Sequence, residues 1–127
     1  MSKAIQFKDN GENVYPIALE RIENSNGTAL KFADGTLICY GTFNITDLSW
    51  SGWGQDYAAD KYCHKLFPIS FKDTPVISVT TSDNALNCWV GRIRITSTEI
   101  ASVCLIRPTS TTITSCSARF IAVGRWR

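Results

Sequence analysis

The sequence predicts an all-β fold, an antiparallel β-sandwich. Apolar and polar residues alternate with the period of a strand, most clearly from Trp89 to Thr96, where Ile93 and Ile95 fall on one face. Turn-forming residues separate such runs at short intervals, and no segment has the period of an amphipathic helix. Roughly six or seven strands joined in this way are typical of a sandwich.

The chain is expected to consist of an N-terminal hairpin with a linker, residues 1–27, followed by a head domain, residues 28–127. Two short apolar runs flank Asp9-Asn10-Gly11, a turn signal that predicts the hairpin. Residues 21–27 are polar and are expected to form the linker. The head domain is long enough to bury one core, and no second core is needed.

The head domain begins with the clearest local signal in the chain. Asp34-Gly35 stands between two alternating runs, which predicts a pair of strands joined by a type I′ turn. The next stretch, residues 44–64, has no clean period and is rich in aromatic residues, so we expect a long loop. Loops of this length are functional or are packed against another surface.

Further strands are expected at residues 66–71, 76–81, 89–96, 100–106 and 118–127. The last of these is apolar on both faces, with Phe120, Ala122 and Trp126 on one and Ile121 and Val123 on the other. A second sheet can cover one face, but the other requires a helix layer or another subunit. Because the sequence has no helical signal, we expect an oligomer.

The composition excludes several classes of function. The net charge is +2, from 13 basic and 11 acidic residues that are scattered along the chain, so no nucleic-acid binding is expected. No stretch approaches the roughly 18 apolar residues of a spanning helix, so we expect that the protein does not insert into a membrane. We expect it to be synthesised in the cytoplasm.

The five cysteines have no close Cys-x-x-Cys spacing, and His64 is the only histidine. Zinc sites need tighter ligand clusters, so no metal or other cofactor is expected. We expect the cysteines to be reduced and packed as small hydrophobic side chains.

Catalysis is not expected either. The chain has one histidine, no Gly-x-Ser-x-Gly motif and no phosphate-binding loop. Asp56 and Asp60 could form the carboxylate pair of a glycosidase, and this remains the enzymatic alternative.

Binding is the better interpretation of the aromatic segment, because indole rings offer flat apolar faces to sugars while nearby polar groups bond the hydroxyls. The alternative is that these rings cover a sheet edge or fill a subunit boundary. Arg92 and Arg94 likewise could reach acidic sugars or pair with carboxylates of a neighbouring subunit. The candidate ligand-binding residues, expected in a groove between subunits, are Trp50, Asp56, Asp83, Asn84, Trp89 and Arg92.

Five segments, taken in order, carry a resemblance to a known family. They are Phe32-Ala33-Asp34-Gly35-Thr36-Leu37-Ile38-Cys39-Tyr40-Gly41-Thr42, Trp53-Gly54 with Tyr57, Phe67-Pro68-Ile69-Ser70-Phe71 with Pro75-Val76-Ile77-Ser78-Val79, Ile106-Arg107-Pro108-Thr109-Ser110, and Phe120-Ile121-Ala122-Val123-Gly124-Arg125-Trp126. Over about residues 28–127 the chain resembles the carboxy-terminal receptor-binding domain of bacteriophage tail fibre and baseplate proteins. The resemblance implies a β-sandwich similar to H-type lectins, trimeric at a fibre tip, that contacts the host cell surface and often its glycans.

From this resemblance we expect a head domain at the phage tail tip that binds the bacterial host surface, a saccharide in particular, as a homotrimer. Its other partners would be further tail and baseplate proteins of the virion. Trimerisation agrees with the two-sided terminal strand, and three weak sites gain avidity when linked. The alternative is a structural cap or trimerisation module that ends a fibre without touching a receptor.

Overall fold

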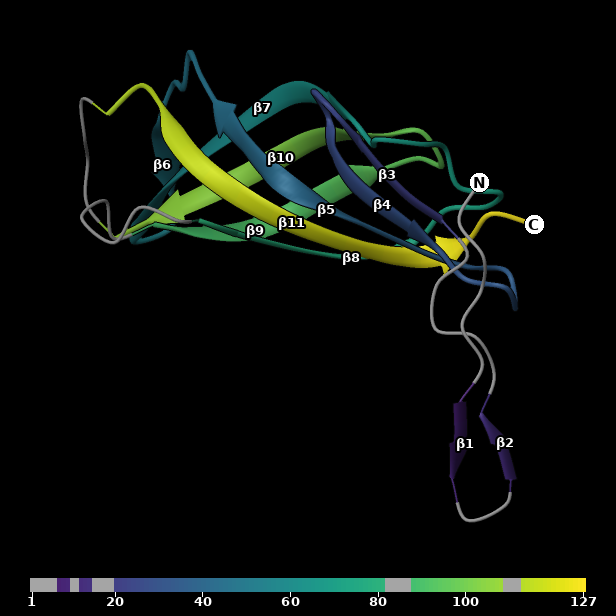
Figure 1. The fold of residues 1–127 in the computed structure, drawn as a ribbon. Helices are drawn as coiled ribbons and strands as arrows, with labels where there is room; N and C mark the ends of the chain where they lie inside the picture. Colours follow the sequence, from purple (N-terminus) through teal and green to yellow (C-terminus); the bar gives the residue numbers. More distant parts are fainter. Residues whose placement is uncertain (1–6, 10–11, 15–19, 82–87, 109–112) are drawn as a thin grey trace.

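Two antiparallel sheets packed face to face form the body of the protein in the computed structural model (Figure 1). The structure describes residues 7–9, 12–14, 20–81, 88–108 and 113–127. These residues contain strands and connecting segments, and no helix. The all-β antiparallel sandwich expected from the alternating runs is therefore confirmed.

The larger sheet has five strands in the order β3-β4-β5-β11-β8. Their bounds are β3 Glu20–Asn24, β4 Gly27–Lys31, β5 Thr36–Ile45, β11 Cys116–Arg125 and β8 Val76–Thr81. The two long strands β5 and β11 pair over their full length, from Cys116 opposite Ile45 to Arg125 opposite Thr36. This pair forms the centre of the sheet, and β3 and β8 form its edges.

The smaller sheet has four strands in the order β6-β7-β10-β9. Their bounds are β6 Ser51–Trp53, β7 Asp56–Leu66, β10 Glu99–Arg107 and β9 Trp89–Ile95. The ladder between β10 and each neighbour shifts register between Ile100 and Ser102, and the ladder with β9 shifts again between Cys104 and Leu105. Such bulges twist the sheet and redirect side chains.

The N-terminal hairpin consists of β1, Phe7–Asp9, and β2, Glu12–Val14, which pair antiparallel as expected. The central residues of its turn, Asn10 and Gly11, lie outside the described residues. Residues 20–24, most of which we expected in a polar linker, form β3 and pair with β4. Charged residues are tolerated there because β3 is an edge strand and its outward face meets water.

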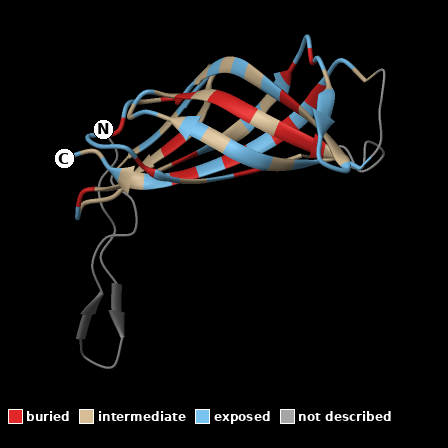
Figure 2. Ribbon diagram, turned by 180° about the vertical axis from the view of Figure 1, so that it is seen from behind, coloured by how far each residue is buried: buried red, intermediate tan, exposed pale blue. Residues whose placement is uncertain are grey.

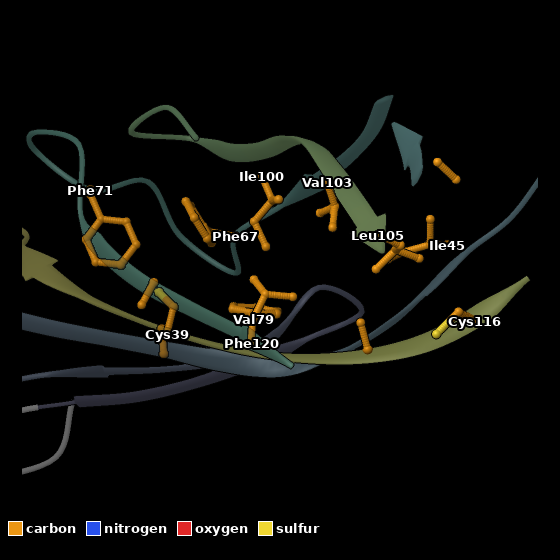
Figure 3. Packing of buried hydrophobic residues seen from close by; sticks show 14 of the residues in the cluster. Cys39, Ile45, Phe67, Phe71, Val79, Ile100, Val103, Leu105, Cys116 and Phe120 are labelled. Carbon is orange, nitrogen blue, oxygen red and sulfur yellow. The ribbon is translucent and has the colours of Figure 1, made fainter. Parts of the chain in front are cut away.

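The core lies between the two sheets and is made of their inward side chains (Figure 3). Phe67 sits at its centre, with its ring 5.1 Å from that of Phe71 and 5.8 Å from that of Phe120. Buried and exposed residues alternate along the long strands, as the colours of Figure 2 show. Full burial of a phenylalanine side chain such as that of Phe67 stabilises the fold by about 1.5–3 kcal/mol.

The terminal strand β11 shows the two faces that the sequence predicts. Phe120 and Ala122 are buried in the core, whereas Ile121 and Val123 keep 47% and 41% of their surface exposed. Trp126 follows the strand and is half-buried, with its Nε1 donating to the Phe32 carbonyl at 2.8 Å. The terminal ring therefore fastens the end of the chain to the β4–β5 hairpin.

The β4–β5 hairpin is present, but its turn is not type I′. That turn needs a positive φ at both central residues, and in this loop only Gly35 has one, at 98°. The loop is wider than a two-residue turn. Gly35 N–H donates to the Phe32 carbonyl at 3.1 Å, and Phe32 N–H donates to the Thr36 carbonyl at 2.9 Å. Asp34 instead accepts a hydrogen bond from Thr36 N–H through its carboxylate at 2.9 Å, which stabilises the turn.

The expectation of a long loop at residues 44–64 is wrong. β5 continues to Ile45, only residues 46–50 are irregular, and β6 and β7 follow. In β7 the outward side chains are polar and the inward positions include Lys61 and Lys65, so the strand has no apolar period. Because both faces of β7 carry polar residues, the alternation of apolar and polar residues could not predict this strand.

The expected strand at residues 66–71 is also wrong. Its first residue ends β7, and the rest crosses one end of the sandwich. Phe67 N–H donates to the Thr98 carbonyl at 3.0 Å, and Phe71 N–H donates to the Ser97 carbonyl at 2.8 Å. Phe67 and Phe71 are both buried, so their spacing, which resembles that of a strand, comes from a connection that places two rings in the core.

Candidate binding surface

The outward side of the four-stranded sheet, which we call the polar face, gathers charged, aromatic and hydroxyl side chains. It is made by β7, β10 and β9, which are neighbours in Figure 1. The residues that form it are Asp60, Tyr62, His64, Trp89, Arg92, Arg94, Ser102 and Cys104. Ser102 is buried, with 3% of its surface exposed. Because the inward side of the same strands fills the core, the exposed side chains of the polar face are available for another purpose.

Small residues on the central strand let the flanking strands touch across it. Cys104 of β10 stands opposite both Asp60 and Arg92, whose backbones lie two strand spacings, about 10 Å, apart. Arg92 Nη2 donates to Asp60 Oδ2 at 2.7 Å over this position. Both side chains remain about half exposed, so the ion pair adds little stability and stays within reach of a ligand.

A second cross-strand contact lies one step further along the sheet. Ser102 stands opposite both Tyr62 and Arg94, and Arg94 Nη1 donates to the Tyr62 hydroxyl at 3.4 Å. The polar face thus presents two arginines from β9 aimed at oxygen atoms from β7. The repeat gives the face a positive edge and an oxygen-rich edge.

His64 occupies the bulge of β7 and has the left-handed φ of 45°. This conformation is costly for a residue with a Cβ and persists only where the surroundings impose it. The imidazole hydrogen-bonds Glu99 Oε1 through Nδ1 at 3.2 Å and stacks on Tyr62, with ring centroids 6.0 Å apart. The bulge therefore turns His64 onto the polar face.

Trp89 owes its environment to Gly91, which lies in the bulge of β9 between Val90 and Arg92. A Cβ on Gly91 would collide with the end of the Ile106 side chain. The glycine lets Ile106 lie flat and buried beside Trp89, although Ile106 is outside the core cluster. Trp89 itself keeps 45% of its surface exposed.

The structure places the predicted site residues in two groups. One row of paired residues crosses all four strands and consists of Ser51, Ala58, Ile106 and Trp89. Three strand spacings separate the backbones of Ser51 and Trp89, a distance of about 14 Å. Trp50 and Asp56 lie near the β6 edge of that row. Trp89 and Arg92 lie near the β9 edge, and one sugar ring cannot contact both groups.

Trp50 has a structural partner that the sequence did not reveal. Its ring is half-buried against the core, and Nε1 donates to the Ile113 carbonyl at 2.8 Å. Asp83 and Asn84, the remaining two candidates, lie outside the described residues. Of the two predicted tryptophans, Trp89 is therefore the one more open to solvent.

Sequence reasoning missed how Asp60, Tyr62 and His64 contribute to one surface with Arg92. They alternate along β7, but the inward positions Lys61 and Lys65 are polar as well, so the sequence has no contrast between the two faces. The described residues include no group of three or more His, Cys, Asp or Glu side chains that could hold a metal ion. They also include no helix of the length and hydropathy needed to cross a membrane.

The outward side of the five-stranded sheet, the apolar face, has the opposite character. Ile121 of β11 stands between Tyr40 and Ser78, and Val123 stands between Ile38 and Val76. Val76 is 79% exposed. The apolar side chains of this face, which give it its name, are Leu30, Ile38, Tyr40, Val76, Ile121 and Val123. Polar side chains, among them Arg21, Thr42 and Arg119, surround them on the same side of the sheet. A contiguous apolar surface on a folded domain marks an interaction site.

Two solved structures are similar to this chain. The C-terminal part of the P. aeruginosa R1 pyocin fibre has 14% sequence identity and a TM-score of 0.51, over 84% of this chain and 28% of that one. An N-truncated R1-type pyocin tail fibre has 15% identity and a TM-score of 0.52, over 84% of this chain and 87% of that one. These structures share the fold.

At such low identity the similarity extends to the fold and no further. The chain spans little more than a quarter of the longer pyocin fibre structure. No protein-family description matches the sequence, and no curated protein does.

Proposed function

We propose that this domain is the head of a phage tail fibre, or of a related tail, and that it binds the bacterial host surface as a homotrimer. The observation that carries the proposal is the polar face, where a half-exposed indole lies beside an exposed arginine–aspartate pair on a rigid sheet. The fold shared with two pyocin fibre structures supports the context of a tail. The domain would then reside at the tip of the virion tail after synthesis in the bacterial cytoplasm, in contact with other tail or baseplate proteins.

The chemistry of the polar face suits a saccharide. The Trp89 ring offers an apolar surface to the C–H face of a sugar. Arg92 donates and Asp60 accepts hydrogen bonds, so together they can bond two neighbouring hydroxyls of one ring. Since the ion pair is already held by the sheet, little side-chain freedom is lost on binding.

The apolar face supports the trimer. Its exposed aliphatic side chains lie on a sheet rather than on a loop, so they form a regular surface that a second subunit can cover. Individual sugar sites are shallow and weak, and three of them on one fibre tip gain avidity. We place the subunit contacts on the apolar face and the receptor on the polar face.

We propose a binding role without catalysis. Asp56 and Asp60, the pair that a glycosidase reading requires, are both on β7, and Asp60 is engaged by Arg92. Loss of carbohydrate cleavage in the Asp56→Asn and Asp60→Asn variants would be needed to support a depolymerase.

The test is binding of labelled protein to cells of candidate hosts and to arrays of bacterial surface glycans. Trp89→Ala should weaken binding by roughly 5- to 150-fold per site, equivalent to about 1–3 kcal/mol for removal of a stacking ring. Trp53→Ala is the matched control, because Trp53 is an exposed tryptophan at the opposite edge of the same sheet. It should leave binding unchanged.

Two results would contradict the proposal. If Trp89→Ala binds like the parent, the polar face is not the receptor site. If the parent binds no cell or glycan from any host of the matching phage, the domain is a structural cap or trimerisation module.

A further inference from the structure

Two cysteines meet at one end of the sandwich, one in the five-stranded sheet and one directly before a strand of the four-stranded sheet. Cys88 immediately precedes β9, and Cys116 is the first residue of β11. Figure 3 labels Cys116 and shows its sulfur in yellow. Their Sγ atoms are 3.8 Å apart, and both are thiols in the structure. A disulfide requires the sulfurs to approach to about 2 Å, so the two side chains must turn further toward each other before the bond can form.

The backbone on both sides of this contact is fixed by the sheets. Thr81, the last residue of β8, donates a hydrogen bond from its hydroxyl to the Cys88 carbonyl at 2.8 Å. Thr81 also pairs with Ala118, two residues along β11 from Cys116 and on the same inward face. Cys116 in turn pairs with Ile45 and is buried. The two thiols therefore meet because of the fold and not by the chance position of a loose side chain.

The other three cysteines have different surroundings. Burial raises the pKa of the Cys39 thiol to about 11, and its Sγ lies 3.9 Å from the Ile69 carbonyl. Burial also raises the pKa of Cys63, whose Sγ donates to the Ile100 carbonyl at 3.3 Å, and that of Cys104. Within the described part of the chain, Cys88 and Cys116 are the cysteines that lie in thiol–thiol contact.

We propose that Cys88 and Cys116 form a disulfide when the protein meets an oxidising environment. The oxidant is a small disulfide such as oxidised glutathione. The thiolate of Cys88, which is partly exposed, attacks it, forms a mixed disulfide and releases one small thiol. The Cys116 thiolate then attacks Cys88 Sγ and releases the second. Two protein thiols are oxidised, and one small disulfide is reduced to two thiols.

The bond would join the two layers of the sandwich. It closes a loop between residues 28 positions apart, which contains all of β9 and β10. Restricting such a loop in the unfolded chain stabilises the folded one. The bond would also fix the start of β9 next to Trp89, so it would stiffen the β9 edge of the polar face. It does not depend on the proposed function, since it follows from the thiol contact alone.

The experiment compares the purified full chain after equilibration with oxidised glutathione and after reduction. Trypsin places Cys88 in the peptide 73–92, and Cys116 shares the peptide 95–119 with Cys104 because Arg107 precedes Pro108. Cys104→Ser removes this ambiguity and also serves as the matched control. In this variant, mass spectrometry without reduction should find peptide 73–92 linked to peptide 95–119, with two thiols lost per chain.

A second measurement is the melting temperature. The oxidised parent should melt about 10 °C higher than the reduced parent, and dithiothreitol should reverse the shift. Cys88→Ser should abolish both the linked peptides and the shift, whereas Cys104→Ser should retain both. The proposal is overturned if the oxidised parent keeps five reactive thiols, if the linked peptides involve other cysteines, or if the bond joins two chains.

Discussion

The two outer faces of the sandwich differ although the two sheets share one core. At the centre of β5, β11 and β8 the outward positions carry aliphatic and aromatic side chains, with polar ones towards the strand ends, while outward positions of β7 and β9 carry the Arg92–Asp60 ion pair and a histidine. The inward positions of both sheets are constrained by the same packing. The outward ones are not, so the two faces can serve different purposes, and the proposed function assigns one to a subunit contact and the other to a polar ligand.

Neighbouring residues of β11 give the largest expected contrast between an inward and an outward position. Phe120→Ala should lower the free energy of unfolding by about 3–5 kcal/mol, because the ring is buried between Phe43 and Phe67 and leaves a cavity. Urea unfolding followed by tryptophan fluorescence measures this. A loss below about 1 kcal/mol would mean that the core between the sheets is not packed as described.

Ile121→Asp tests the outward position next to it. If the apolar face is a subunit contact, the buried charge should weaken association by at least about 2 kcal/mol and convert the trimer to monomers at micromolar concentration in sedimentation velocity. Tyr62→Asp on the polar face is the control and should leave the mass unchanged. A parent that sediments as a monomer would refute the trimer, and equal masses for the parent and Ile121→Asp would exclude the apolar face as the contact.

Trp126→Ala asks whether the terminal ring stabilises the fold or the assembly. The indole bonds the Phe32 carbonyl and lies under the Lys31 ammonium, with the nitrogen 5.2 Å from the ring centroid. Since these contacts are within one chain, we expect a loss of about 2–3 kcal/mol in unfolding free energy with no change of mass. A lower mass with unchanged stability of the subunit would assign the ring to the interface.

Asp60→Asn and Arg92→Gln should have the smallest effect on stability. Their ion pair is half exposed, so each change should alter the free energy of unfolding by less than about 1 kcal/mol. Receptor binding should nevertheless weaken, because a donor or an acceptor of the polar face is lost. Chemical unfolding and cell binding measured on the same preparations separate the two effects; unchanged binding in both variants would remove the pair from the site.

The alternation of apolar residues predicted most of the five-stranded sheet, including β8 and β11, and it also predicted β9 and β10. It failed at β7, where polar residues occupy both faces, and at Phe67 and Phe71, which belong to a connection rather than a strand. The polar face could be predicted only in part. Arg92 meets Asp60 across a third strand and 32 positions of sequence, a contact that depends on the register of both ladders.

The partner of Trp50 was hidden for a similar reason. Its indole bonds a carbonyl 63 positions away, in the segment before β11. No local pattern around Trp50 reports such a contact. An aromatic residue in an irregular segment therefore does not by itself distinguish a ligand site from a brace for the fold.

The edge strand β8 has a consequence for how the protein must be produced. Its six residues, Val76–Thr81, carry no charge and are mostly β-branched, and one side of the strand has no neighbour within its sheet. Such a segment is a template for pairing between chains that have not finished folding. The N-terminal end of β8 is preceded by two charged residues and a proline, Lys72, Asp73 and Pro75, which oppose aggregation at that end of the strand only. Soluble yield should therefore depend on how quickly new chains complete the five-stranded sheet. At high concentrations of unfolded chain, aggregation into inclusion bodies should proceed through pairing at β8.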